Sequence, residues 1–261
     1  MEQNKEQIVI SENNLIIEDK KYTGALGAFQ PHPDGRPRHT FRTQSVLVDG
    51  HNITFKRCVF ENTAGKGSEV GQAIALYVDG DNITFEECKI VAHQDSLFLA
   101  PLPPKEYEKD GFLGPKQYEP RTNRVVHFKN CFIEGGVDFV FGGATAYFDN
   151  CTFISNEVGY IFAPCTPKEV EEGFVVRSCR FETIDGIEKG SCFIGRPWRE
   201  YAKIKLIDCY LGEHINKKGW DDWGKTQSHQ TIRFEEYGSY GPGASDQDRP
   251  YYVIVDKSVP N

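Results

Sequence analysis

The sequence contains no apolar run that approaches the ~18 residues that a membrane-spanning helix needs. Its first ten residues, MEQNKEQIVI, lack both the basic region and the apolar region of a signal peptide. Positive charge is also in short supply, because 30 Lys and Arg face 38 Asp and Glu, which gives a formal net charge of −8. We therefore expect a cytoplasmic protein with no membrane or nucleic-acid partner. The alternative location is outside the cell, after removal of a leader.

The eight cysteines form no CxxC pair and no Cys/His cluster with zinc spacing, so neither a metal site nor another cofactor is expected. Six of them end copies of one repeated phrase, which is clearest in VDGHNITFKRC and VDGDNITFEEC. These six are Cys58, Cys88, Cys131, Cys151, Cys179 and Cys209. We interpret them as small buried side chains rather than disulfide or metal partners. Cys165 and Cys192 stand outside the repeat and could be exposed thiols.

The repeat also predicts the fold. Successive cysteines are 30, 43, 20, 28 and 30 residues apart, which suggests solenoid coils of about 20 residues with loops inserted in some of them. Each copy alternates hydrophobic and polar residues as a strand does, and Asp-Gly and Gly-Gly pairs indicate turns. We expect an all-β, single-stranded, right-handed parallel β-helix with an interior cysteine ladder. Residues 1–261 form one domain, with an atypical N-terminal cap at 1–35, an inserted loop at 101–124 and a C-terminal tail packed on the solenoid at 224–261.

Two acids occupy equivalent places in this repeat. Asp95 follows Cys88 by seven residues, and Asp138 follows Cys131 by seven. Alignment of GQAIALYV, HQDSLF and GVDFVF on coils ~4.8 Å apart places Gln72 over Gln94 and Asp95 over Asp138.

Two carboxylates this close should have one raised and one low pKa. One acid can then attack while the other donates a proton, and glutamine N–H groups can stabilise an oxyanion. The simpler interpretation of Asp138 is a turn residue beside glycines.

Six segments, in order along the chain, resemble the pectin methylesterase (pectinesterase) family of carbohydrate esterases. They are GQAIALYV, HQDSLF, GGVDFVFGGA, GRPWREY, GWDDW and FEEYGSYGPGA. The resemblance covers about residues 40–256 and implies hydrolysis of C6 methyl esters of homogalacturonan to pectate and methanol.

The resemblance also implies residue roles. Asp138 would be the nucleophile and Asp95 the general acid and later base. Gln72 and Gln94 would form the oxyanion site, and Arg196 would hydrogen-bond Asp138 and keep it ionised. Substrate contacts are expected from Trp198, Phe141, Val137, Thr40, Trp220 and Tyr201. Trp220 and Trp223 are close in sequence, and one of the two is expected in the core.

The expected partner is methyl-esterified polygalacturonate or its oligomers. The family has a cap helix and strands ahead of the segment that Asn14–Glu18 resembles. Either the true N-terminus lies upstream, or residues 1–35 cap the open β-helix end differently, or a second subunit covers it. The chain is otherwise expected to be a monomer.

Other functions stay open at this point. An esterase or thioesterase of the same fold could act on a non-pectic ester, or a catalytically silent β-helix could bind polysaccharide. A pectate lyase would need a calcium site, and a polygalacturonase would need acids spaced for inversion. The 101–124 loop, with Tyr107, Phe112 and Tyr118, is either a wall of the cleft or a mobile excursion.

Overall fold

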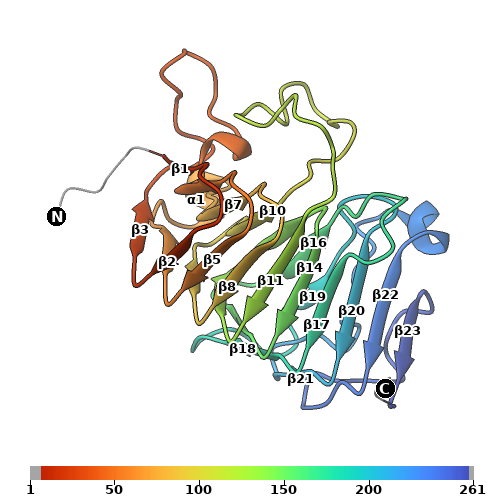
Figure 1. The fold of residues 1–261 in the computed structure, drawn as a ribbon. Coiled ribbons are helices and arrows are strands. Elements are labelled where there is room, and N and C mark those ends of the chain that lie inside the picture. The colour runs from red at the N-terminus through yellow and green to blue at the C-terminus, as the bar shows by residue number, and fades with distance from the viewer. Residues whose placement is uncertain (1–6, 259–261) are drawn as a thin grey trace.

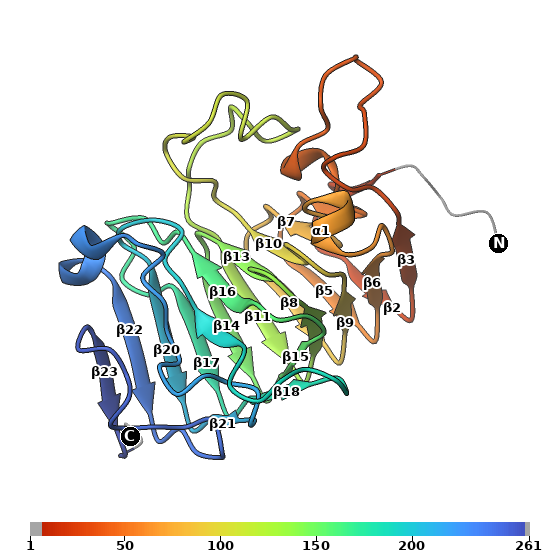
Figure 2. The same ribbon diagram turned by 180° about the vertical axis from the view of Figure 1, so that it is seen from behind.

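The computed structural model describes residues 7–258, in which 23 short strands form three parallel sheets of seven, nine and seven strands (Figures 1 and 2). The chain visits the three sheets in turn on each coil, so the molecule is a right-handed parallel β-helix, as the repeat predicts. None of the helices in the described residues has the length and apolar character of a membrane span.

Each sheet contains one strand from every coil that reaches it. The first sheet consists of β1 (Ile8–Ile10), β4 (Val46–Val48), β7 (Leu76–Val78), β10 (Leu97–Leu99), β13 (Val140–Gly142), β16 (Tyr160–Pro164) and β19 (Phe193–Gly195). The second consists of β2 (Ile16–Glu18), β5 (Ile53–Lys56), β8 (Ile83–Glu86), β11 (Val125–Lys129), β14 (Thr145–Asp149), β17 (Phe174–Arg177), β20 (Lys203–Ile207), β22 (Arg233–Tyr237) and β23 (Val253–Asp256). The third consists of β3 (Lys21–Gly24), β6 (Val59–Asn62), β9 (Lys89–Val91), β12 (Phe132–Gly135), β15 (Thr152–Ser155), β18 (Arg180–Thr183) and β21 (Tyr210–Leu211). Three short helices lie between strands: η1 (Thr40–Arg42), α1 (Gly67–Val70) and η2 (Thr226–Gln230).

The register of the coils is set by side chains that stack inside the solenoid. Phe55 stacks on Phe85, Phe85 on Phe128, and Phe128 on Phe148, with ring centroids 5.0, 4.8 and 4.7 Å apart. All four rings are completely buried. Because a shift of one residue would turn each ring outward, this column fixes the register of the four coils that carry these rings.

The cysteine ladder is present in the interior. All eight cysteines are free and buried, and the thiols of the repeat contact the backbone of the preceding coil, as from Cys131 Sγ to the carbonyl of Phe85 at 3.4 Å. Cys165 and Cys192, which could have been exposed thiols, are instead at most 3% exposed. Cys192 belongs to the main core, and Cys165 directly follows β16, where its Sγ lies 3.9 Å from the carbonyl of Pro101.

The two ends of the solenoid differ from the sequence-based division of the chain. Residues 8–24, assigned from the sequence to a cap, instead form the first coil through β1, β2 and β3. The segment assigned to a C-terminal tail contributes β22 and β23, which extend the second sheet. Residues 1–6 and 259–261 lie outside the described part.

A buried ion pair fastens the last part of the chain. Arg249 Nε donates to Glu236 Oε1 at 2.6 Å, and its Nη2 donates to Oε2 at 3.1 Å; both side chains are 1% exposed. Trp220 Nε1 donates to the same carboxylate at 2.7 Å. Arg249 Nη1 also donates to the carbonyl of Lys217 at 2.6 Å, so the buried charges are hydrogen-bonded within the protein.

We expect Glu236→Gln to lower the free energy of unfolding by about 3–5 kcal/mol, because Arg249 would be left as a buried charge without a counter-charge. Urea denaturation of the two proteins measures the difference. The matched control is Glu182→Gln, which breaks the exposed pair with Arg180 and should cost at most about 1 kcal/mol. Equal effects of the two substitutions would contradict the assignment of Arg249 as a buried anchor.

Candidate active site

The candidate site is built at the turns through which successive coils enter the first sheet. The backbone N–H of Ala73 donates to the carbonyl of Gln94 at 3.0 Å, and that of Asp95 donates to the carbonyl of Val137 at 3.0 Å. These bonds set Gln72 level with Gln94 and Asp95 level with Asp138, as the alignment of the repeat predicts. Asp95 and Asp138 have φ values of 64° and 50°. Other turns of the solenoid use the same left-handed conformation, as at Asn52 and Asn82, so it marks a turn of the coil and is not by itself a sign of a functional site.

Arg196 reaches Asp138 from the end of β19, two coils further along. Its Nε donates to Asp138 Oδ1 at 2.8 Å, and its Nη2 donates to Oδ2 at 2.7 Å. The side chains of Arg196 and Asp138 are only 15% and 11% exposed. The expected contact is therefore a largely buried, bidentate pair, which fixes the orientation of the carboxylate.

The two carboxyls differ in what surrounds them. Burial raises the pKa of Asp95 well above its usual value, and the nearby charge of Asp138 raises it further. Burial also raises the pKa of Asp138, but the hydrogen bonds and charge of Arg196 and the charge of Lys225 oppose this shift. The expectation of one low pKa is thus not met, because Asp138 is buried as well. The order is nevertheless clear: Asp138 ionises before Asp95.

The side chains of Gln72, Gln94, Asp95 and Asp138 line one cleft. Its lining residues are Thr40, Phe41, Gln72, Gln94, Asp95, Gly111, Asp138, Phe141, Ala163, Arg196, Trp198 and Trp223. A Cβ on Gly67, in α1, would lie 2.2 Å from Gln94 Oε1, so only glycine there leaves room for this amide. Within residues 7–258, neither Gln72 nor Gln94 uses its side-chain amide in a hydrogen bond to another residue, which leaves both sets of N–H donors for a bound molecule.

The loop between β10 and β11 forms one wall of the cleft and is fixed in place. Gly111 lines the cleft, and the buried ring of Phe112 packs on Trp198, with ring centroids 6.3 Å apart. The guanidinium of Arg199 lies 3.7 Å from the ring centroid of Tyr107. Arg121 donates to four loop carbonyls, those of Pro103, Lys116, Gln117 and Glu119. Figures 1 and 2 show this loop (yellow-green) rising from the same side of the solenoid as the excursion between β3 and β4.

Three of the expected substrate contacts are not in the cleft. Trp220 is 1% exposed and stacks on Phe234 at 4.6 Å, so it is the core tryptophan and Trp223 is the one that faces the cleft. Tyr201 lies away from the lining, with Lys168 Nζ 5.5 Å from its ring centroid. Val137 packs toward Gly159 of the next coil instead of into the cleft.

The expected contacts from Trp198, Phe141 and Thr40 do line the cleft. Within the 101–124 loop, Tyr118 is 92% exposed and takes no part in the wall.

The sequence motifs did not reveal Lys225, a cation near the two acids. Its Nζ donates to the carbonyls of Pro197 and Trp198 at 2.6 and 3.3 Å and lies 4.0 Å from the centroid of the Trp223 ring. Burial and then the charges of Arg199 and Arg196 lower its pKa to about 8. The only signal in the sequence is its place two residues after GWDDW.

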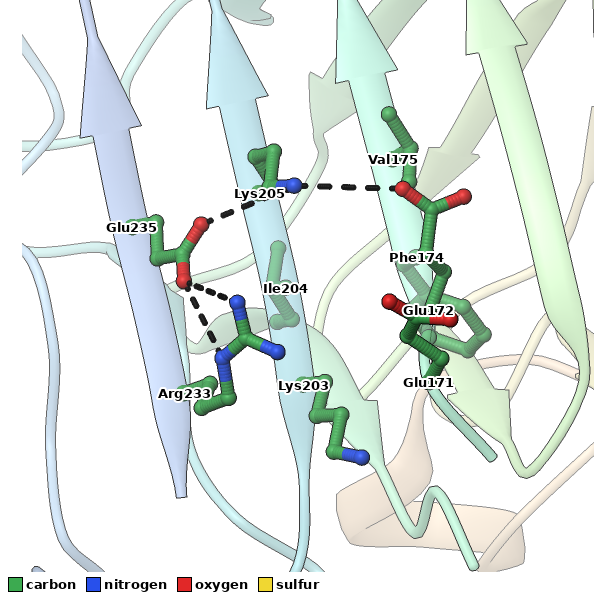
Figure 3. Close-up of a pocket in the computed structure, with 10 residues that line it drawn as sticks. Glu171, Glu172, Phe174, Val175, Lys203, Ile204, Lys205, Arg233 and Glu235 are labelled. Carbon is green, nitrogen blue, oxygen red and sulfur yellow. Dashed lines mark hydrogen bonds and ion pairs between the residues drawn. The ribbon is translucent and has the colours of Figure 1, made fainter. Parts of the chain in front are cut away.

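A second hollow lies on the outer face of β17, β20 and β22, on a different sheet (Figure 3). Four of its charged side chains pair with one another: Glu235 contacts Arg233 at 2.9 Å and Lys205 at 3.8 Å, and Lys205 lies 3.8 Å from Glu172. Such a row of neutralised pairs is an ordinary polar sheet face rather than a reactive site. In the described part of the chain, no three His, Cys, Asp or Glu side chains are grouped to hold a metal ion.

Comparison with known proteins gives one consistent family. The family model described as Pectinesterase matches residues 5–102 and 120–256. The stretch that it leaves out, residues 103–119, lies within the loop that forms the cleft wall.

The chain is 32% identical to Pectinesterase 31 of Arabidopsis thaliana over 211 residues, which are 80% of this chain and 58% of that protein. It is 30% identical to Putative pectinesterase 14 of the same plant over 266 residues, 98% of this chain and 71% of that protein. This chain thus spans little more than half the length of the first of these relatives.

Among solved structures, the pectin methylesterase from Aspergillus niger superimposes with a TM-score of 0.77 and 24% identity, over 98% of this chain and 78% of that one. The pectin methylesterase from carrot gives a TM-score of 0.73 and 24% identity, over 97% and 80%. A pectin methylesterase in complex with a hexasaccharide gives 0.73 and 24%, over 94% and 80%. At these identities the structures support the fold.

Proposed function

Because the chain belongs to the pectinesterase family, we propose that it hydrolyses the C6 methyl esters of homogalacturonan to carboxylates and methanol. The observation that carries this proposal is the bidentate contact of Arg196 with Asp138, beside Asp95 and two free glutamine amides in one cleft. Acyl transfer needs a nucleophile, a proton donor and an oxyanion site within reach of one carbonyl carbon, and this cleft supplies residues of each type.

In the proposed reaction, a carboxylate oxygen of Asp138 attacks the ester carbonyl carbon, and the N–H groups of Gln72 and Gln94 stabilise the resulting oxyanion. Asp95 then donates its proton to the methoxy oxygen. The C–O bond to the methoxy group breaks, methanol leaves, and Asp138 is joined to the substrate as an anhydride. Asp95, now ionised, takes a proton from the water that attacks the anhydride, so both acids return to their starting states.

The expected substrate is a methyl-esterified galacturonan chain or oligomer. Trp198 and Phe141 present aromatic surface to the cleft, which suits the apolar face of a sugar ring. A related pectin methylesterase has been solved with a hexasaccharide. We further propose that the loop wall, which the family match leaves out, limits how the saccharide enters from that side.

The test is release of methanol and new carboxylates, in equal amounts, from highly esterified pectin and from methylated oligogalacturonates. Simple acyl esters and thioesters, assayed in parallel, test the alternative that the protein is an esterase or thioesterase for non-pectic esters. We expect turnover of the pectic esters only. Turnover confined to simple esters or thioesters would contradict the proposal, and so would saccharide binding without methanol release.

The pH dependence of kcat/KM should be bell-shaped. Asp138 must be ionised to attack, and its pKa is raised by burial, so activity should fall as pH decreases through that raised value rather than near the value of an exposed aspartate. Asp95 must hold its proton, and its pKa is raised further, so activity should fall again as pH increases through that higher value. Initial rates of methanol release across pH measure both limbs; a rate that rises steadily into alkali would contradict the assignment of Asp95.

A further inference from the structure

The guanidinium of Arg196 lies between two aromatic rings. Its central carbon is 3.8 Å from the ring centroid of Tyr160 and 3.7 Å from that of Trp223. A guanidinium is planar with two faces, so two rings at this distance occupy one face each. Its edge meanwhile donates the two hydrogen bonds to Asp138.

Both rings are themselves held from behind. Tyr160 stacks on Phe193 of the next coil, with centroids 5.3 Å apart and planes 22° apart. Trp223 has φ of 55°, and its backbone N–H donates to Asp221 Oδ1 at 2.7 Å, which secures this unusual turn. Lys225 Nζ lies 4.0 Å from the same indole ring centroid. Phe193, Tyr160, Arg196, Trp223 and Lys225 thus form a continuous set of aromatic and cation–π contacts.

We propose that Tyr160 and Trp223 are positioning residues for the nucleophile, which hold the plane of Arg196 in line with the carboxylate of Asp138. A bidentate contact requires the guanidinium and the carboxylate to share a plane, and a long arginine side chain does not hold one plane unaided. Stacking on both faces supplies that restraint and also favours the cation, whose side chain is only 15% exposed. This inference rests on the proposed function only where it predicts rates.

The position of Arg196 in turn affects the protonation of Asp138, which is faced by Asp95, Arg196 and Lys225. Arg196 and Lys225 favour the ionised form of Asp138, and burial opposes it. Without the rings, Arg196 would spend less time in the bidentate geometry, and Asp138 would gain its proton at higher pH. We call the arrangement of Tyr160 and Trp223 on the two faces of Arg196 the clamp. It also predicts that Trp223 acts through Arg196 and is not a stacking surface for sugar.

The test compares Tyr160→Leu and Trp223→Leu with Tyr160→Phe and Trp223→Phe, which keep an aromatic face. In the leucine variants kcat should fall about tenfold with KM unchanged, and the acid limb of the pH profile should move to higher pH. The phenylalanine variants should retain most of the activity. Tyr210→Leu is the matched control, because it removes a similar contact with Arg180, at 4.2 Å on another sheet, and should change nothing in the cleft.

Hydrogen exchange of the Arg196 Nε–H, followed by ¹⁵N NMR and assigned with Arg196→Lys, tests the clamp without any turnover. Exchange should quicken in both leucine variants and stay slow in both phenylalanine variants. If the enzyme turns over pectin but exchange and the acid limb are unchanged in the leucine variants, the clamp is wrong while the function stands. A rise in KM with unchanged kcat in Trp223→Leu would instead make Trp223 a sugar-binding surface. If exchange responds as expected but no pectic ester is hydrolysed, the function is wrong and the clamp stands.

Discussion

Asp138→Asn is expected to lower kcat for methanol release by at least about 10⁴-fold, because it replaces the attacking carboxylate with an amide that cannot form the anhydride. Asparagine has almost the same shape and tolerates the left-handed conformation that Asp138 adopts. It can also still accept a hydrogen bond from Arg196. The loss should therefore reflect chemistry rather than misfolding, and it should be seen in kcat with little change in KM.

Asp208→Asn is the matched control for this substitution. Asp208 is exposed, has φ of 53° and precedes Cys209 in the repeat, far from the cleft lining. It should leave kcat and thermal stability unchanged. Asp138→Asn with more than a tenth of the parent rate, in a protein that melts at the parent temperature, would remove Asp138 from the role of nucleophile.

Asp95→Asn is expected to lower kcat for methyl esters by about 10²–10⁴-fold, because methanol would leave without a proton donor and water would attack without a base. The alkaline limb of the pH profile should disappear as well, since asparagine has no proton to lose. Both effects follow from the burial that keeps Asp95 protonated to higher pH than an exposed aspartate.

An ester with a better leaving group separates the two tasks of Asp95. A galacturonate ester of a phenol needs little protonation to depart, so its first step should be largely restored in Asp95→Asn, and phenol release should show a burst before slow turnover. A proportional loss for both esters, without a burst, would mean that Asp95 does not act as the acid for the first step.

Much of the fold could be predicted because the repeat can be recognised directly in the sequence. The phrase that ends at each ladder cysteine recurs with its phenylalanines at the same interior positions, as at Phe55 and Phe85, and a solenoid is the simplest structure that buries them all. The same repeat aligned Asp95 with Asp138, two residues that neighbouring coils bring together.

The rest depended on which way single side chains point, and repeat patterns do not determine this. Trp220 and Trp223 are three residues apart, yet one fills the core and the other faces the cleft, because the chain turns sharply at Trp223. Tyr160 contacts Arg196 from the preceding coil, and Lys225 contacts the carbonyl of Pro197 from the segment before β22; the repeat pattern predicts neither contact. Cys165 and Cys192 looked exposed because they stand outside the ladder, but other buried positions accept a cysteine equally well.

Separate protonation of two adjacent carboxyls is the property on which the proposed chemistry depends, and a ¹³C NMR titration of the aspartate-labelled protein measures it directly. The pair should titrate in two steps. The Asp138 resonance, identified by its absence from Asp138→Asn, should move chiefly in the lower step, and the Asp95 resonance chiefly in the upper one. If the order is reversed, or if both resonances move together at the pH of an exposed aspartate, the cleft does not hold an ionised nucleophile beside a protonated acid.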